Sequence, residues 1–432
     1  MMPPSAHIHI SGIGGVGMNA IAQLLAADGC RVSGSDRFLD QGTRLPVFDA
    51  LEARSITLVP QDGTALTPGT AALVISTAVE EDNPERLRAR GLGIPERHRA
   101  EVLADFAHRG PLIAIAGTSG KTTCTGWLGV VLESGGLNPN VVNGGGILNW
   151  KTPSTPGNVR LGQPKSPWIV EVDESDQSLL RFHPDIALIT SITADHHSLE
   201  DTITLFRQFA LQVKHHIVCG PGVREHLQNL PGLSASLHET GKPLPSHLPG
   251  LHNQLNAAAV ARLAELAGLP DARGHLRAFG GVERRLERLT PPGPGPQVYD
   301  DYAHNPEKIA AAIRALQEPG RRLTVLWRPH GFAPLRQNFD ALADAFANTL
   351  RPEDQAWILP VFYAGGNAPK GIEGADLARA IQERGAKAEA LPDYPASLLL
   401  VPGQTLLVMG ARDPQLPAFA RAVAGSSSQV FH

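Results

Sequence analysis

Residues 112–123 read Leu-Ile-Ala-Ile-Ala-Gly-Thr-Ser-Gly-Lys-Thr-Thr, a short apolar strand that runs into a glycine-rich turn. Residues 124–133 then continue with a helical pattern. A strand that passes through a glycine turn into a helix points several backbone N–H groups, and the positive end of the helix dipole, at one place. This arrangement suits a bound phosphate and predicts an α/β fold around it.

The side chains of this turn extend the phosphate prediction. Lys121 can neutralise charge on the outer phosphates, and the Thr122 hydroxyl can hold Mg²⁺. The spacing is the variant A-x-x-G-T-x-G-K-T-T, because Ile115 stands where the usual phosphate loop has its first glycine. We therefore expect a nucleoside triphosphate with Mg²⁺ to be bound by Gly117, Thr118, Ser119, Gly120, Lys121, Thr122 and Thr123.

Length and composition set outer limits on the function. A chain of 432 residues with 42% hydrophobic residues predicts about three domains, each with its own core. The net charge of −4 provides no basic field for nucleic acid and no polybasic run for a membrane surface. No apolar run approaches the roughly 20 residues that span a bilayer. No secretory signal is visible, so we expect a cytoplasmic enzyme. We expect it to be a monomer or a weak homodimer.

The three cysteines favour neither a disulfide framework nor a zinc site. Cys30, Cys124 and Cys219 are odd in number, far apart in the sequence and without C-x-x-C spacing. We expect each to be a small buried apolar residue.

Alternating strand and helix patterns run along the whole chain. This alternation predicts mostly parallel sheets covered by helices, with boundaries at Arg109-Gly110 and at the Pro-Gly run of residues 291–296. We expect a Rossmann-like domain over residues 1–109, a central ATPase-like domain with the phosphate loop over 110–290, and a second Rossmann-like domain over 291–432. Residues 151–166 and 235–249, rich in Pro, Gly and Ser, are expected to be loops.

A second glycine motif lies near the start of the chain. Residues 12–17 fit G-x-G-x-x-G between a predicted strand and a predicted helix, and Asp36 ends the next strand. This layout is typical of a dinucleotide site, and NAD is its ordinary ligand. Because a separate triphosphate domain follows, we interpret it as a site for the diphosphate of a nucleotide-activated substrate. The predicted contacts are Gly12, Gly14, Gly15, Val16, Gly17, Met18, Ser35 and Asp36.

Acidic residues and histidines follow two of the central strands. Glu171 and Asp173 come after an apolar strand, at the end where ligands bind in parallel sheets, and would share one face of an extended segment. Their carboxylates suit Mg²⁺. His196 comes after the next strand and is, from the residues alone, as readily a core or loop histidine as a ligand.

Taken together, the motifs resemble those of the Mur ligases of peptidoglycan synthesis over nearly the whole chain and in the family's order. The matching segments are Gly-Ile-Gly-Gly-x-Gly-Met with Ser33-Gly-Ser-Asp36, Gly-Thr-x-Gly-Lys-Thr-Thr, Glu171-Val-Asp-Glu-Ser-Asp, Ala194-Asp-His196, Gly250-Leu-His-Asn253-x-x-Asn256-Ala, Phe279-Gly-Gly-Val-Glu-Arg-Arg285 and Asp300-Asp-Tyr-Ala-His304-Asn-Pro306. The first-domain motif and the acidic segment are most similar to those of the alanine-adding members.

The resemblance implies an ATP-dependent amide ligase that joins L-alanine to the carboxylate of UDP-N-acetylmuramate. The carboxylate would attack the γ-phosphate to give an acyl phosphate, which the incoming amine would then attack. Lys121 would stabilise the transferring phosphoryl group. Mg²⁺ would be held by Thr122 and Glu171, and a second Mg²⁺ by His196.

The remaining roles implied by the resemblance concern the two nucleotides and the acceptor. Asn253 and Asn256 would contact adenine, while Arg285 and Asp301 would approach the γ-phosphate and the ribose. Asp36 would read the uracil end of the sugar nucleotide. His304 and His330 would lie near the acceptor.

The chain departs from the alanine-adding pattern in its last third. The family's Pro-His-Arg-Tyr-Thr-Arg stands here as Pro329-His-Gly-Phe-Ala-Pro-Leu-Arg336, and His-His-Pro stands as His304-Asn-Pro. Ser119 also replaces a usual His. The first change removes an Arg from the region that positions the amine and its carboxylate, and Arg336 or Arg328 would have to replace it. Lys214 is the single candidate for the carbamylated lysine of some members, and its spacing argues against that role.

Three alternatives remain open from the sequence. A ligase that adds a murein tripeptide or another amino acid to the same nucleotide fits the same motifs. An NAD-linked oxidoreductase fits residues 12–17 but leaves Lys121 and Glu171 unexplained. A nucleotide-binding regulatory protein without turnover would fit the altered acceptor region.

Overall fold

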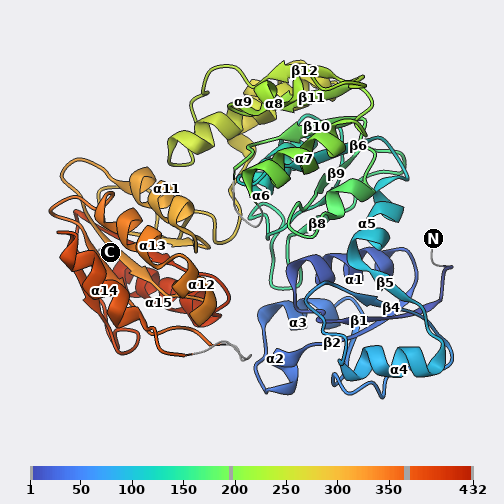
Figure 1. Cartoon of the computed structure of the whole chain (residues 1–432), viewed down its shortest axis with the longest axis horizontal. Helices are drawn as coiled ribbons and strands as arrows, with labels where there is room; N and C mark the ends of the chain where they lie inside the picture. Colours follow the sequence, from blue (N-terminus) through green and yellow to red (C-terminus); the bar gives the residue numbers. More distant parts are fainter. Residues whose placement is uncertain (1–2, 194–197, 364–369, 430–432) are drawn as a thin grey trace. The chain divides into compact units, whose positions relative to one another are not determined.

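The computed structural model describes residues 3–193, 198–363 and 370–429 (Figure 1). The chain forms two compact units. One unit comprises Met1–Ser246 and Gln254–Val282, and the other comprises His247–Asn253 and Glu283–His432.

The first sheet of the larger unit is built from the N-terminal segment, drawn in blue in Figure 1. Its five strands are all parallel, in the order β3-β2-β1-β4-β5. They are β1 (His7–Ser11), β2 (Arg31–Ser35), β3 (Thr57–Leu58), β4 (Thr70–Ile75) and β5 (Glu96–His98). The helices of this segment are α1 (Val16–Ala27), α2 (Arg37–Asp40), α3 (Pro46–Glu52), α4 (Pro84–Leu92) and α5 (Arg99–Ala107).

The second sheet has seven strands in the order β12-β11-β10-β6-β9-β7-β8, and only the edge pair β7–β8 is antiparallel. The strands are β6 (Leu112–Ala116), β7 (Asn140–Val142), β8 (Val159–Arg160), β9 (Trp168–Glu171), β10 (Ile186–Ile189), β11 (His216–Cys219) and β12 (Ser236–Glu239). The helical segments are α6 (Lys121–Ser134), η1 (Ser178–Arg181), α7 (Leu199–Ala210), α8 (Val223–Leu227), α9 (Leu251–Leu266), α10 (Ala272–His275) and η2 (Leu276–Ala278).

Two segments predicted to be loops contribute edge strands to this sheet. β8 lies within residues 151–166 and β12 within residues 235–249, so the loop prediction was wrong at these places. Both strands are short and lie at the two outer edges, where pairing with a neighbour outweighs weak strand propensity. The central strand β6 is buried at every position, which explains its continuous apolar sequence.

The smaller unit contains the third sheet, in the order β13-β14-β18-β15-β16-β17 with β13 antiparallel to its neighbour. Its strands are β13 (Glu287–Arg288), β14 (Gln297–Asp301), β15 (Arg322–Trp327), β16 (Gln355–Ile358), β17 (Ala388–Ala390) and β18 (Gln404–Met409). The helices are α11 (Pro306–Leu316), α12 (Phe332–Gln337), α13 (Phe339–Ala347), α14 (Gly374–Glu383) and α15 (Gln415–Gln429). Strand β13 precedes the Pro-Gly run at which the sequence predicts a boundary.

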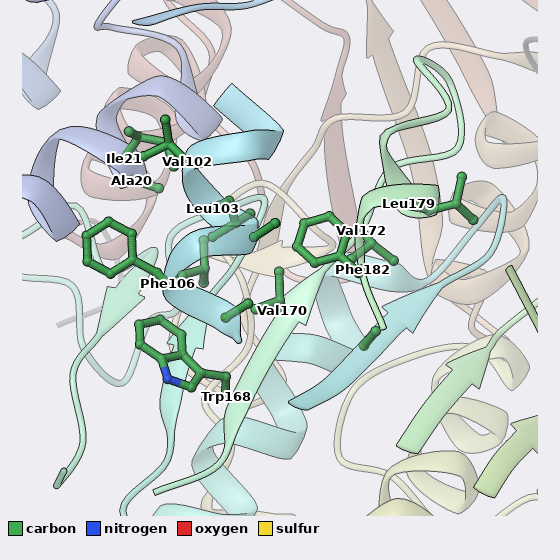
Figure 2. Close-up of a cluster of buried hydrophobic side chains, with 14 of the residues drawn as sticks. Ala20, Ile21, Val102, Leu103, Phe106, Trp168, Val170, Val172, Leu179 and Phe182 are labelled. Carbon is green, nitrogen blue, oxygen red and sulfur yellow. The ribbon is translucent and has the colours of Figure 1, made fainter. Parts of the chain in front are cut away.

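The first two sheets share one hydrophobic core (Figure 2). Val102, Leu103 and Phe106 of helix α5 lie between Ile21 of α1 on one side and the strand β9 region on the other. Helix α5 therefore belongs to both layers, and the two sheets form one compact unit. The predicted boundary at residues 109–110 follows this helix and stays a prediction.

The α/β class and the parallel sheets predicted from the sequence are confirmed. All three cysteines are free and buried, as expected. Among the described residues, no helix combines the length and the apolar character that crossing a membrane requires.

Candidate functional site

The phosphate turn connects β6 to α6 and holds Lys121 in a defined position. Lys121 Nζ donates hydrogen bonds to the Gly117 carbonyl oxygen and to Glu174 Oε2, both at 2.7 Å. The Glu174 side chain is only 5% exposed, and its burial raises its pKa above the ordinary range. Glu174 was not among the predicted site residues. A buried carboxylate beside a lysine of the turn is the signal that only the fold reveals.

Gly117 leaves no room for a side chain in this turn. Its φ is +121°, and a Cβ at this position would lie 2.1 Å from Thr190 Oγ1. Any other residue would therefore push the turn away from the segment that follows β10.

Hydroxyl groups after β10 support the turn from the side. The Thr118 hydroxyl lies 3.0 Å from Ser191 Oγ and 2.8 Å from Thr193 Oγ1. The Ser119 backbone N–H donates to Ser191 Oγ at 3.1 Å. Neither Ser191 nor Thr193 was predicted. Their proximity follows from the pairing of β10 with β6, which no local motif encodes.

Oxygen atoms suited to Mg²⁺ converge at the start of α6. The Thr122 hydroxyl donates to Glu171 Oε1 at 2.9 Å, and Glu171 Oε2 accepts from the Gly144 backbone N–H at 2.7 Å. A hydroxyl and a carboxylate fit Mg²⁺, which takes few protein ligands and completes its shell with water and phosphate oxygens. Within the described ranges, no group of three or more His, Cys, Asp or Glu could hold a metal ion.

The predicted pairing of Glu171 with Asp173 on one face does not lead to a common target. Asp173 lies 3.5 Å from Arg99 Nη2, whereas Glu171 contacts Thr122. Strand β9 ends at Glu171, so the alternation of an extended segment stops before Asp173 is reached. Glu174, not Asp173, is the second carboxylate beside the phosphate turn.

The first glycine turn, between β1 and α1, is fixed from strand β2. The backbone N–H groups of Gly12 and Ile13 donate to the Ser35 carbonyl oxygen, both at 2.9 Å. The Gly14 N–H donates to Asp36 Oδ2 at 2.9 Å, and a Cβ on Gly14 would lie 2.8 Å from that oxygen. Gly14 is therefore required by the close approach of Asp36.

The N-terminus of α1 has the features of an anion site. Its cap residue, Gly15, has no side chain to occupy the N–H groups of the first turn, and Val16 is 44% exposed. Gly17 lies close to Arg99, because a Cβ on Gly17 would be 3.2 Å from Arg99 Nη1. Met18 is buried beneath the turn.

Asp36 is held at the first glycine turn by two backbone N–H groups. It is 7% exposed, and its second oxygen accepts the Phe38 N–H at 2.9 Å as the cap of α2. With both oxygens on backbone N–H groups, the side chain shapes the glycine turn. Direct reading of uracil by Asp36 stays a prediction.

The predicted adenine contacts lie on helix α9. Asn256 approaches the phosphate turn, since its Oδ1 would be 3.1 Å from a Cβ on Gly120. Asn253 is buried and its Nδ2 donates to the Pro249 carbonyl oxygen at 2.7 Å.

Arg285 and Asp301 belong to the smaller unit. Asp301 accepts the backbone N–H groups of Leu286 and Ala303, both at 2.7 Å, and is 8% exposed; burial raises its pKa. Arg285 lies over the Tyr302 ring, 5.6 Å from its centroid. The structure thus brings Arg285 and Asp301 to one place, with Asp301 bracing the backbone on both sides.

The predicted acceptor residues include a histidine pair. The rings of His304 and His330 are 5.0 Å apart, edge to face. Burial, His304 and Arg412 lower the pKa of His330 to about 4. Arg336 is exposed on α12. Arg328 donates to Asp413 at 2.6 Å and to the Pro360 carbonyl oxygen at 3.2 Å, and replacement of the missing Arg by Arg328 or Arg336 stays a prediction.

His196 and Lys214 are the two remaining residues with a predicted role at a metal ion. His196, with Asp195 and His197, lies outside the described residues. Lys214 pairs with Asp185 at 2.9 Å, and both residues precede strands β11 and β10. Lys214 therefore lies at the amino ends of the parallel strands, whereas the phosphate turn follows β6 and lies at their carboxyl ends. This position argues against a metal-bridging lysine.

Comparison with known proteins gives the same family over most of the sequence. Residues 7–110 match the profile described as "Mur ligase family, catalytic domain", and residues 284–412 match "Mur ligase, glutamate ligase domain". A relative from Thermosynechococcus vestitus named UDP-N-acetylmuramate–L-alanine ligase is 33% identical, covering 93% of this chain and 92% of the relative. One of the same name from Burkholderia thailandensis is 36% identical, covering 94% and 95%.

The fold agrees with these sequence matches. The crystal structure of a UDP-N-acetylmuramate–alanine ligase from Thermotoga maritima superimposes with a TM-score of 0.79 at 24% identity, covering 98% of this chain and 99% of that one. The relatives exceed 30% identity over nearly their full length, and the family profiles cover both ends of the chain. This chain belongs to the Mur ligase family.

Proposed function

We propose that this protein joins L-alanine to the carboxylate of UDP-N-acetylmuramate, with ATP as the energy donor, in the synthesis of peptidoglycan precursors. The observation that carries this proposal is the pairing of Lys121 with Glu174 and of Thr122 with Glu171 at one strand end. Two relatives named UDP-N-acetylmuramate–L-alanine ligase support the proposal, because they are 33% and 36% identical to this chain over nearly their whole length.

The chemistry requires two steps. A carboxylate oxygen of the sugar nucleotide bonds to the γ-phosphorus of ATP while the bond to ADP breaks, which gives an acyl phosphate. The uncharged amine of alanine then bonds to the acyl carbon, the amine loses a proton, and inorganic phosphate leaves. Lys121 would stabilise the negative charge of the phosphoryl group during the first step. Glu174 positions the Lys121 ammonium group for this role.

The turn itself would hold the phosphates of ATP. The N–H groups at the start of α6 have no side-chain cap, because Gly120 is the cap residue. Thr122 and Glu171 are the residues that would hold Mg²⁺, since they offer the hydroxyl and carboxylate oxygens that this ion prefers. When bound, Mg²⁺ supplies positive charge to the outer phosphates.

The first glycine turn would hold the diphosphate of the sugar nucleotide. Its support comes from the uncapped start of α1 and from Arg99, whose guanidinium group lies beside Gly17. Arg99 also pairs with Asp176 at 3.0 Å, and Asp176 follows the strand that carries Glu171. Arg99 would therefore link the diphosphate site to the acidic segment near the phosphate turn.

The test is release of ADP by the purified protein in the presence of ATP, Mg²⁺ and UDP-N-acetylmuramate. We expect release that depends on L-alanine, with a UDP-linked alanine product identified by mass spectrometry. Release that depends on the murein tripeptide L-alanyl-γ-D-glutamyl-meso-diaminopimelate, and not on L-alanine, would replace this proposal by a peptide ligase. Amine-independent hydrolysis or none at all would contradict both.

A further inference from the structure

One residue of the smaller unit has a backbone conformation that its side chain does not explain. Arg412 has φ of +66°, and the Asp413 N–H donates to the Ala411 carbonyl oxygen at 2.8 Å across it. Arg412 is therefore the central residue of a three-residue γ-turn with positive φ, a rare and strained conformation. Glycine is the residue that adopts it without strain.

The residues on either side of Arg412 maintain this strained turn. Ala411 is buried, and Asp413 accepts hydrogen bonds from Arg328 and from the Tyr394 hydroxyl, both at 2.6 Å. Between them, the Arg412 side chain is exposed. Strained non-glycine residues persist where their surroundings fix them, and they cluster at functional sites.

The sheet register brings Arg412 together with the two histidines. Asp301, Trp327 and Met409 are level with one another at the carboxyl ends of β14, β15 and β18, which are neighbours. His304, His330 and Arg412 each lie three residues beyond these level positions. Two imidazoles and a guanidinium group therefore follow the carboxyl ends of three adjacent parallel strands, the end at which ligands bind in such sheets.

The electrostatics at these strand ends distinguish Arg412 from its neighbours. His330 has a lowered pKa of about 4, so it is neutral at pH 7, and Arg412 contributes to that lowering. The His304 Nδ1–H donates to the Tyr302 carbonyl oxygen at 3.0 Å. Two other guanidinium groups near these strand ends already have a carboxylate partner. Arg328 pairs with Asp413, and Arg284, which donates to the Gly410 carbonyl oxygen, pairs with Asp300. Among the residues that the structure describes, Arg412 forms no ion pair with a carboxylate, and its side chain is exposed.

We propose that Arg412 binds the α-carboxylate of the incoming amino acid and thereby sets the acceptor specificity of this chain. The proposal rests on the proposed ligase function, and Arg412 would replace the one arginine by which segment 329–336 differs from the pattern of the alanine-adding members. A guanidinium group can bind a carboxylate through two parallel N–H···O bonds, which fixes its orientation and so the position of the amine.

The test compares steady-state kinetics of the wild type with Arg412→Gly, Arg412→Lys and Arg322→Ala. Glycine suits the backbone at this position, so Arg412→Gly should melt at the wild-type temperature or above it. We expect it to raise KM for L-alanine at least tenfold and to leave KM for ATP and for UDP-N-acetylmuramate unchanged. The KM of Arg412→Lys for L-alanine should lie between that of the wild type and that of Arg412→Gly. Arg322→Ala is the matched control, because Arg322 is exposed at the amino end of β15, away from the carboxyl ends that lead to His304, His330 and Arg412. This substitution should leave all three KM values unchanged.

A second readout uses L-alaninamide, which has the amine but no carboxylate. The wild type should prefer L-alanine over the amide, and Arg412→Gly should lose that preference. An unchanged KM for L-alanine in Arg412→Gly, or a larger change in Arg336→Ala, would overturn the assignment while leaving the ligase function in place. Absence of alanine-dependent turnover in the wild type would overturn the ligase function, and the assignment with it.

Discussion

The two glycine-rich turns of the larger unit use the same backbone device with different partners. In each, a parallel strand passes through a turn into a helix whose cap residue is a glycine. The turn after β6 has its own cation, Lys121, and carboxylates from the neighbouring strand β9. The turn after β1 has no charged residue, and Arg99 of α5 lies beside Gly17 at the start of the helix that follows.

This difference indicates which phosphate each turn would serve. A transferring phosphoryl group with Mg²⁺ needs a fixed cation and hard oxygen ligands, and these stand at the second turn. A diphosphate that is bound without reacting needs backbone N–H groups and a nearby positive charge, and the first turn offers its uncapped N–H groups and Arg99. The shared backbone therefore suits phosphate in general, whereas the side chains assign the role.

The largest expected effect is that of Lys121→Ala on turnover. Loss of the ammonium group beside Glu174 should lower kcat by about 1,000-fold, as removal of one preorganised charge in a phosphoryl-transfer site does. Affinity for UDP-N-acetylmuramate should stay unchanged. Lys214→Ala is the matched control, because Lys214 lies at the amino ends of the strands of the same sheet, away from the phosphate turn. Equal losses in the two variants would contradict the role of Lys121.

Gly14→Val should affect the other turn alone. The added side chain would collide with Asp36 Oδ2 at 2.8 Å and with Phe48 Cε1 at 3.0 Å, and so displace the turn. We expect KM for UDP-N-acetylmuramate to rise by about 100-fold, with KM for ATP near the wild-type value. Gly91→Val serves as control, because a Cβ there meets open space. A rise confined to KM for ATP would reverse the assignment of the turns.

Glu174→Gln sharpens the comparison at the second turn. The amide keeps the shape but removes the counter-charge of Lys121, and we expect kcat to fall about tenfold, the cost of one hydrogen bond to a charged group. Burial raises the pKa of Glu174, so this carboxylate should become protonated at a higher pH than exposed carboxylates do. Turnover of the wild type should therefore fall on acidification more steeply than that of the variant. Parallel pH profiles would sink this interpretation.

The smallest expected effect is that of Asp36→Asn at the first turn. One carboxylate oxygen is replaced by an NH₂ group, which cannot accept from a backbone N–H, so one of the bonds to Gly14 and Phe38 is lost. We expect a rise of about fivefold in KM for UDP-N-acetylmuramate, consistent with about 1 kcal/mol for a hydrogen bond. A loss of binding by more than 100-fold would favour direct recognition of the nucleotide by Asp36.

The sequence predicts those parts of the fold and the candidate site that short-range patterns encode. The strand, turn and helix around residues 112–123 appear as expected, because buried parallel strands are continuously apolar and glycine turns follow them. The contact of Thr122 with Glu171 follows from the pairing of β6 with β9. Glu171 ends β9, and Thr122 lies in the first turn of α6, which begins after the turn that follows β6.

The features that were not predicted depend on contacts between distant segments. Glu174 reaches Lys121 only because β9 ends at Glu171 and the chain then turns. The burial of Asp36 depends on a turn 22 residues earlier in the sequence. The strain at Arg412 comes from the network around Asp413, and nothing in the local sequence marks it.

Calorimetric titration of the two ligands into the two turn variants tests the division of labour most directly. UDP-N-acetylmuramate and a non-hydrolysable ATP analogue with Mg²⁺ would each be titrated into Gly14→Val and Lys121→Ala. We predict that Gly14→Val loses the sugar nucleotide and keeps the ATP analogue, while Lys121→Ala keeps the sugar nucleotide. If both variants lose the same ligand and keep the other, the two turns do not serve two nucleotides, and the account is wrong.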